Sequence, residues 1–219
     1  HIKLAGGEPL YSKHFKWLID ILIEKANPKQ IELHIITNAS LFPNKDILNK
    51  LLKFKKVKIN ISIDGYGDFQ TCIRPPTPWN IIDKNIKLWY KTPFEKTFAV
   101  TLSILNINMM QNLYDFILNL TKDELGLTIL HEPSYLNILQ LPLEIRNNFK
   151  IDLRNIKYDD GTARAEGWNS YIAIDQKYNI KPQWQTLLRS IDAMDEYHEL
   201  KFSDLNPEMY ELIGDYVYG

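Results

Sequence analysis

Polar residues that could bind a ligand or move a proton stand at the ends of apolar segments that are typical of strands. The first group, Gly6-Gly7-Glu8-Pro9, directly follows the segment Ile2–Ala5. Two successive glycines let a ligand approach bare backbone, and Glu8 places a carboxylate beside them. Taken alone, the first ten residues favour an ordinary strand-to-helix turn.

Four further polar groups follow the other apolar segments of the first 133 residues. They are Thr37-Asn38, Ser62 with Asp64, Ser103, and His131-Glu132-Pro133. Each has a plain structural reading as a helix cap, a turn, a core residue or a structural histidine. The carboxyl ends of parallel strands share one edge, where α/β folds have their sites. We therefore predict that the five groups belong to one site.

The elements that must position these groups alternate between strands and helices. Strands are expected at Ile2–Ala5, Ile31–Thr37, Val57–Ile63, Thr97–Leu105 and Leu127–His131. Segments with helical spacing of apolar residues are Leu10–Lys25, Ile47–Leu52, Ile81–Trp89 and Met109–Leu120. This alternation predicts an α/β fold with a parallel sheet, either doubly wound or closed towards a barrel.

Two of the expected strands alternate strictly between apolar and polar or small residues, namely Val57–Asp64 and Thr97–Leu105. Strands covered by helices on both faces of a sheet are usually apolar throughout. Alternation instead suits a barrel strand with one face towards the helices and one towards a polar lumen. We favour this interpretation over a sheet with one solvent-exposed face.

The pattern changes near Pro142. Beyond it, helices are expected near Leu143–Arg154, Ala163–Asp175, Gln183–Leu200 and Pro207–Tyr218. We predict a barrel core over residues 1–140 and a mostly helical extension over 141–219 that packs on the barrel.

The composition is that of an ordinary globular protein. The 219 residues are 45% apolar and 24% charged, and a net charge of −1 favours neither nucleic acid nor an anionic membrane as partner. No apolar run reaches the length of a membrane span. The single cysteine, Cys72, excludes a disulfide framework and a Cys-based metal site within the chain. It also favours a reducing, cytoplasmic location.

The polar groups lie in longer stretches that resemble the radical S-adenosylmethionine (SAM) enzymes, especially their twitch and SPASM-type relatives. The stretches are LAGGEPL at 4–10, IITNAS at 35–40 and ISIDGYGDFQTCIRPPTPWNIIDKNI at 61–86. The segment 192–209 is similar to the end of small proteins of this type. The resemblance implies a partial (β/α)6 TIM-like barrel. It also implies reductive cleavage of SAM by a [4Fe–4S] cluster, and hydrogen abstraction by the resulting 5′-deoxyadenosyl radical.

The resemblance also implies which residues bind SAM. Glu8 and the backbone of Gly6 and Gly7, in a motif that ends in Pro9, would hold the amino group of SAM. Arg74 would pair with its carboxylate. Ser62 and Asp64 would contact the ribose or methionine end of SAM. Thr37 and Asn38 would line the pocket. Ser103 and the segment Leu130–Pro133, which includes His131, would contact the nucleoside. No catalytic residue is assigned.

The sequence departs from this family in one respect. The CxxxCxxC loop that holds the cluster would precede Gly6, and neither the loop nor its strand is in these 219 residues. Cys72 alone cannot hold a cubane cluster. We therefore expect a chain truncated at its N-terminal side and inactive by itself, with cluster ligands outside it and no auxiliary cluster in 134–219. The reductant would be a flavodoxin or ferredoxin. The substrate is open between a peptide and a small molecule such as the heterocycle of 7-carboxy-7-deazaguanine synthase.

Two other functions remain open at this point. One is a cluster-free TIM-like barrel in which Glu8, Asp64 and His131 act as acid, base or metal ligands, provided that they converge. The other is a non-catalytic scaffold that binds a partner through its C-terminal helices. Their aromatic residues are Trp168, Tyr171, Trp184, Tyr197 and Phe202.

Overall fold

The computed structural model describes residues 1–120, 125–151, 169–170, 172–173 and 182–219. These residues form two compact units. Unit 1 contains His1–Ile63, Thr77–Ala99 and the residues up to Gly126 that begin the last strand. Unit 2 contains Asp64–Pro76, the segment that begins at Val100, and the chain from Leu127 to Gly219. The domain boundary expected near residue 140 stays a prediction.

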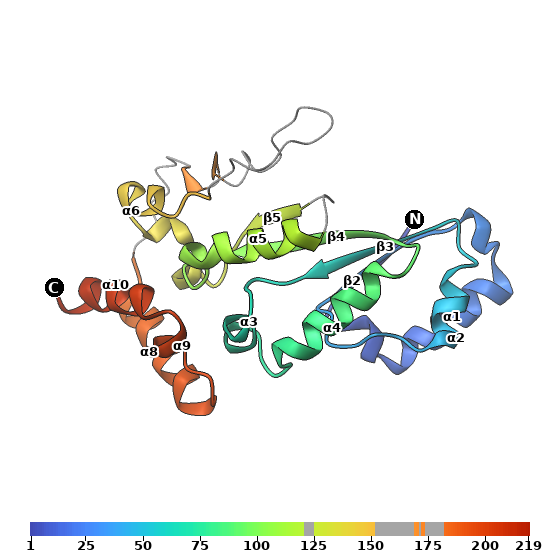
Figure 1. Ribbon diagram of the computed structural model, residues 1–219, viewed down its shortest axis with the longest axis horizontal. Coiled ribbons are helices and arrows are strands. Elements are labelled where there is room, and N and C mark those ends of the chain that lie inside the picture. The colour runs from blue at the N-terminus through green and yellow to red at the C-terminus, as the bar shows by residue number, and fades with distance from the viewer. Residues whose placement is uncertain (121–124, 152–168, 171, 174–181) are drawn as a thin grey trace. The chain divides into compact units, whose positions relative to one another are not determined.

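The described strands form a single five-stranded sheet in the order of the sequence (Figure 1). They are β1 (Ile2–Leu4), β2 (Glu32–Thr37), β3 (Lys56–Ser62), β4 (Glu95–Leu102) and β5 (Leu125–Ile129). The pairings of β1 with β2, β2 with β3 and β3 with β4 are parallel. With helices between the strands, this is the α/β fold of a partial TIM-like barrel, and it confirms the predicted fold class.

The alternation along β3 determines which of its side chains are buried. Val57, Ile59 and Ile61 are at most 5% exposed, whereas Lys58 and Asn60 between them are half-buried. The register places Ile35 of β2 opposite Ile59. The apolar set of each strand thus lies beside that of its neighbour, which is the arrangement that two-residue periodicity predicts.

Helices of unit 1 connect these strands. They are η1 (Pro9–Tyr11), α1 (Lys13–Lys25), η2 (Pro28–Gln30), α2 (Lys45–Leu51) and α4 (Trp79–Tyr90). Ser12 caps α1 by accepting the amide N–H of His14, so the helix expected at Leu10–Lys25 is a short 3-10 turn followed by an α-helix. In α4 the apolar stripe buries Trp89, which packs edge-on against Phe42.

Unit 2 is mostly helical. Its helices are α3 (Asp68–Ile73), η3 (Ile107–Met109), α5 (Met110–Leu120), η4 (Ser134–Leu136), η5 (Ile138–Gln140), α6 (Leu143–Asn147), α8 (Trp184–Tyr197), α9 (Phe202–Leu205) and α10 (Pro207–Tyr218). The last three pack together (red in Figure 1). Helix α10 has the predicted bounds, whereas α6 ends seven residues before the predicted Arg154, a residue outside the described ones. Most of the helix expected at Ala163–Asp175 also lies outside the described residues.

None of the helices within the described ranges is both long and apolar enough to cross a membrane.

Candidate functional site

The turn after β1 exposes backbone next to a carboxylate. Gly6 has a φ of 99° and Gly7 a φ of 56°, a left-handed region that favours glycine. Both residues are exposed, and a Cβ added to either one would meet nothing within 4 Å. Open space therefore lies beside the Cα atoms of two successive residues. This is the local arrangement that a ligand held by bare backbone requires.

Glu8 follows this turn and is held by three donors. Its Oε1 accepts the amide N–H of Leu10 at 3.1 Å, and its Oε2 accepts the hydroxyl of Thr37 at 2.9 Å and the amide N–H of Asn38 at 2.7 Å. Pro9 is buried and starts η1. The structure thus brings together the first two predicted polar groups, both within unit 1.

The second group forms a tight turn after β2. Thr37 is buried, and its Oγ1 also accepts the amide N–H of Ala39 at 3.0 Å. Asn38 accepts the amide N–H of Ser40 through its side chain at 2.9 Å. These contacts direct the Thr37 hydroxyl and the backbone N–H of Asn38 at the same oxygen of Glu8, Oε2.

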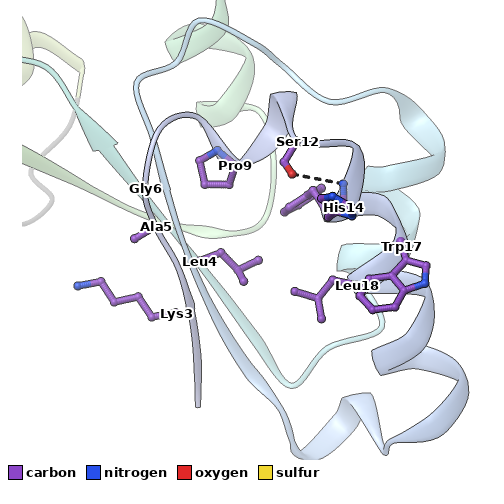
Figure 2. A pocket seen from close by; sticks show the side chains of 10 residues that line it. Lys3, Leu4, Ala5, Gly6, Pro9, Ser12, His14, Trp17 and Leu18 are labelled. Carbon is purple, nitrogen blue, oxygen red and sulfur yellow. Dashed lines mark hydrogen bonds between the residues drawn. The ribbon is translucent and has the colours of Figure 1, made fainter.

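A cavity of about 300 Å³ adjoins the glycine turn (Figure 2). It is lined by Lys3, Leu4, Ala5, Gly6, Pro9, Ser12, His14, Phe15, Trp17 and Leu18. Trp17 is 60% exposed. Gly6 and Pro9 are shared with the predicted site, but Glu8 is not among the lining residues. The cavity therefore borders the predicted site without containing its carboxylate.

In unit 2, an ion pair links Asp64 and Arg74. The Arg74 Nη1 donates to Asp64 Oδ2 at 3.0 Å, and the amide N–H of Thr101 donates to Asp64 Oδ1 at 2.7 Å. The Asp64 side chain is only 14% exposed. Burial raises the pKa of the Asp64 carboxyl above its ordinary value, although the Arg74 guanidinium and the Thr101 amide act in the opposite direction.

Two buried amides hold the backbone around this ion pair. Asn106, which is 1% exposed, donates to the carbonyls of Asp64 at 2.8 Å and Thr101 at 2.9 Å. Gln70 of α3, also 1% exposed, accepts the amide N–H groups of Asp64 at 2.8 Å and Gly65 at 2.7 Å. The position of Asp64 is thus set by side chains from two later elements.

The other predicted residues are placed as follows. Ser103 is buried, and its amide and hydroxyl donate to Asn106 Oδ1 at 2.8 and 3.3 Å. Ser62 ends β3 and is half-buried, and His131 follows β5 and is exposed. Ser103 thus joins the network around Asp64. The assignment of all the predicted site residues to a ligand stays a prediction.

No metal site is formed by the side chains that the structure describes. Within those ranges, no group of three or more His, Cys, Asp or Glu side chains could hold a metal ion. Cys72 is 1% exposed, and burial raises its pKa to about 11, so its thiol stays protonated at neutral pH. The sequence has no other cysteine, so these 219 residues do not fit a [4Fe–4S] cluster.

The aromatic residues of the C-terminal helices divide between core and surface. Phe202 is fully buried and contacts Phe69 with ring centroids 6.0 Å apart, whereas Tyr197 is 84% exposed. Trp184 stacks on Tyr216 at 4.6 Å. Trp168 and Tyr171 lie outside the described residues.

Comparison with known proteins identifies the family. Residues 1–117 match the family model of the Radical SAM superfamily, which is more than half of the chain. The chain belongs to this superfamily of enzymes. The turns at Gly6–Pro9 and Thr37–Asn38 and the ion pair of Asp64 with Arg74 all lie within the matched residues.

The fold of this radical SAM chain is similar to that of a solved structure described as "Native anSMEcpe with bound AdoMet and Cp18Cys peptide", in which AdoMet is SAM. The TM-score is 0.51 at 16% sequence identity. The similarity covers 67% of this chain and 43% of that chain, so the present chain spans less than half of its neighbour's length. A search of curated proteins finds no match.

Three buried amide side chains that hold the backbone of the turns were not predicted from the sequence: Gln70, Asn106 and Asn85, whose Nδ2 donates to the carbonyl oxygen of Ala39 at 2.8 Å. Asn85 had a readable signal, because it stands on the apolar stripe of its helix with Ile82 and Trp89. A polar residue on a buried stripe indicates a hydrogen-bond partner elsewhere in the fold. Gln70 lies in α3, a six-residue helix that is not among the helical segments predicted from the sequence.

Proposed function

We propose that the protein binds SAM and, with a [4Fe–4S] cluster, generates a 5′-deoxyadenosyl radical that abstracts hydrogen from its substrate. Membership of the radical SAM superfamily supports this reaction class. The observation that carries the SAM part is the carboxylate of Glu8 beside two exposed glycines in left-handed backbone. The cluster supplies the electron for SAM cleavage, and its cysteine ligands would lie outside these 219 residues.

Glu8 has the capacity to bind the ammonium of SAM. An ionised carboxylate offers about four acceptor positions. Three are used by Leu10, Thr37 and Asn38, and Oε1 accepts only one of these bonds. The remaining position on Oε1 would accept an N–H of the ammonium in a charge-assisted hydrogen bond. The open backbone of Gly6 and Gly7 would let the methionine end approach.

Arg74 would recognise the carboxylate of SAM. A planar guanidinium fork suits a carboxylate. The Arg74 guanidinium is held by Asp64, whose Oδ2 accepts from Arg74 Nη1 at 3.0 Å. Asp64 would then orient Arg74. The other proposed SAM-binding residues are Pro9, Thr37, Asn38, Ser62, Ser103 and His131.

For the substrate, we propose a peptide first and a small molecule second. The peptide in the description of the structural neighbour supports this order. The reductant would be a flavodoxin or ferredoxin, and the location would be cytoplasmic.

The SAM proposal predicts a large effect of Glu8→Gln. This substitution keeps the shape of the side chain but removes the charge that the ammonium would meet. Charge-assisted hydrogen bonds contribute about 1.5–3 kcal/mol, so the Kd for SAM should rise roughly 10- to 100-fold. Equilibrium dialysis with radiolabelled SAM, extended to millimolar concentration, would measure it.

The matched control is Glu24→Gln, the same chemical change at an exposed carboxylate of α1. Its Kd should equal that of the unmodified protein. The proposal would be refuted by a protein that does not bind SAM, or by equal affinities of the Glu8 and Glu24 variants.

The cluster part has a separate test in the coding sequence upstream of His1. A strand followed by CxxxCxxC would supply the ligands, and an anaerobic assay should then detect 5′-deoxyadenosine. An upstream sequence that starts at methionine without the three cysteines would contradict the radical chemistry and favour a non-catalytic scaffold.

A further inference from the structure

The turn after β2 contains a residue in an unfavourable conformation. Ala39 has a φ of 59°, and it is the single non-glycine residue with positive φ among those that the structure describes. The left-handed region costs free energy for a residue with a Cβ. Ala39 is also fully buried. The surrounding structure must therefore stabilise this conformation.

The conformation determines what Glu8 contacts. Ala39 lies directly after Asn38, whose amide N–H donates to Glu8 Oε2 at 2.7 Å. The amide N–H of Ala39 donates to Thr37 Oγ1 at 3.0 Å, while the Thr37 hydroxyl donates to the same Glu8 oxygen at 2.9 Å. A change in the turn at Ala39 would therefore disturb two of the three donors on Glu8.

Asn85 holds this turn from a distant part of the chain. Its Nδ2 donates to the carbonyl oxygen of Ala39 at 2.8 Å, across 46 residues of sequence. Asn85 is 7% exposed on the buried stripe of α4. A buried amide directed at this carbonyl is an anchor for the turn, because an apolar side chain would serve if packing alone were needed.

We propose that Asn85 is a positioning residue of the SAM site. It holds Ala39 in its left-handed conformation and thereby keeps Thr37 and Asn38 on Glu8 Oε2, which leaves Oε1 oriented for the ammonium of SAM. Asn85 acts through the turn and does not bind SAM itself. The inference rests on the proposed function in its SAM part, whereas the anchoring of the turn can be tested without SAM.

The first test is backbone amide exchange by NMR on the protein without SAM. Asn85→Leu keeps a similar volume but removes the donor, and it should increase the exchange rates of the Asn38 and Ala39 amides at least 10-fold. The control is Asn80→Leu, the same change at an exposed position of α4, which should leave these rates unchanged. Unchanged protection of both amides in the Asn85 variant would overturn the proposal.

The second test uses Ala39→Gly as a rescue. Glycine adopts positive φ without the cost of a Cβ, so the turn then depends less on Asn85. Asn85→Leu should weaken SAM binding at least 10-fold, and the double variant with Ala39→Gly should recover most of that loss. A purely structural defect at Asn85 would not be relieved by glycine at a different position, so absence of rescue would also overturn the proposal.

The two proposals fail in different ways. If the unmodified protein does not bind SAM, the proposed function is refuted, while amide exchange still decides whether Asn85 anchors the turn. If SAM binds normally and Asn85→Leu leaves its Kd unchanged, the positioning role is refuted and the proposed function stands.

Discussion

At the scale of single residues, Asp64 shows how opposing electrostatic effects combine. Burial raises the pKa of its carboxyl and is the largest effect, followed by the Arg74 charge, which lowers it. The net direction is upward, so the folded protein binds a proton to Asp64 more tightly than the unfolded chain does. The ion pair with Arg74 is therefore better explained as a means of orienting Arg74 than as a source of stability.

This direction predicts how stability depends on pH. With a raised folded pKa, the contribution of Asp64 to the free energy of unfolding falls as pH rises from 3.8 through the folded pKa, and is constant above it. Asp64→Asn removes this titration. Urea unfolding at a series of pH values should show that the unmodified protein loses stability relative to the variant over this window. A relative gain with rising pH would show that Arg74 outweighs burial.

At the scale of elements, Asn206 lies between α9 and α10 and connects these two helices to the segment after β4. Its Oδ1 accepts the amide N–H of Met209 at the start of α10. The Asn206 Oδ1 also accepts Asn108 Nδ2 at 2.7 Å. The Asn206 Nδ2 donates to Asn108 Oδ1 at 2.9 Å and to the carbonyl of Leu105 at 3.1 Å. The residue is 2% exposed. The Asn206 side chain thus caps α10 and fixes the position of this helix within unit 2.

Replacing Asn206 by Ala should lower the free energy of unfolding by about 1–3 kcal/mol. The loss combines a helix cap with the hydrogen bonds to the half-buried Asn108 and Leu105. Chemical denaturation would measure it. Asn27→Ala is the control, because Asn27 caps the 3-10 helix η2 at an exposed position, and it should cost less. An equal loss in the two variants would contradict the connecting role of Asn206.

At the scale of the whole molecule, ligand binding and folding are linked. Glu8, which is proposed to bind SAM, is held in place by Thr37 and Asn38, which are 29 and 30 residues away in the sequence. A ligand that binds only the folded chain stabilises it by RT ln(1 + [L]/Kd). Loss of a residue that binds SAM would reduce this stabilisation.

SAM at a concentration 100 times its Kd should stabilise the folded protein by about 2.7 kcal/mol and raise Tm by a few degrees. Differential scanning calorimetry would measure the shift. At the same SAM concentration, the shift should be strongly reduced in Glu8→Gln and in Arg74→Gln. A shift that persists in both variants would place SAM binding at other residues.

Much of the fold could be predicted because its signals are local. The alternation in Val57–Ile63 reports which side of a strand is buried, and β3 buries Ile59 and Ile61 as expected. The bounds of α10 follow from Pro207 at its first turn and from helical spacing. Helix α3 was not predicted because six residues between a glycine-containing turn and a proline-rich segment are too few for a clear period.

By itself, the sequence determined the order of the five strands, the family, and the polar residues that follow the strands. Periodicity and the glycine motif depend on neighbours in the chain, so they can be read without coordinates. Only the tertiary structure decided how these residues are held. Asn85 meets Ala39 across 46 residues, and Asn106 meets Asp64 across 42. Such contacts form when separate elements pack together, and no local pattern specifies the partner of a buried amide.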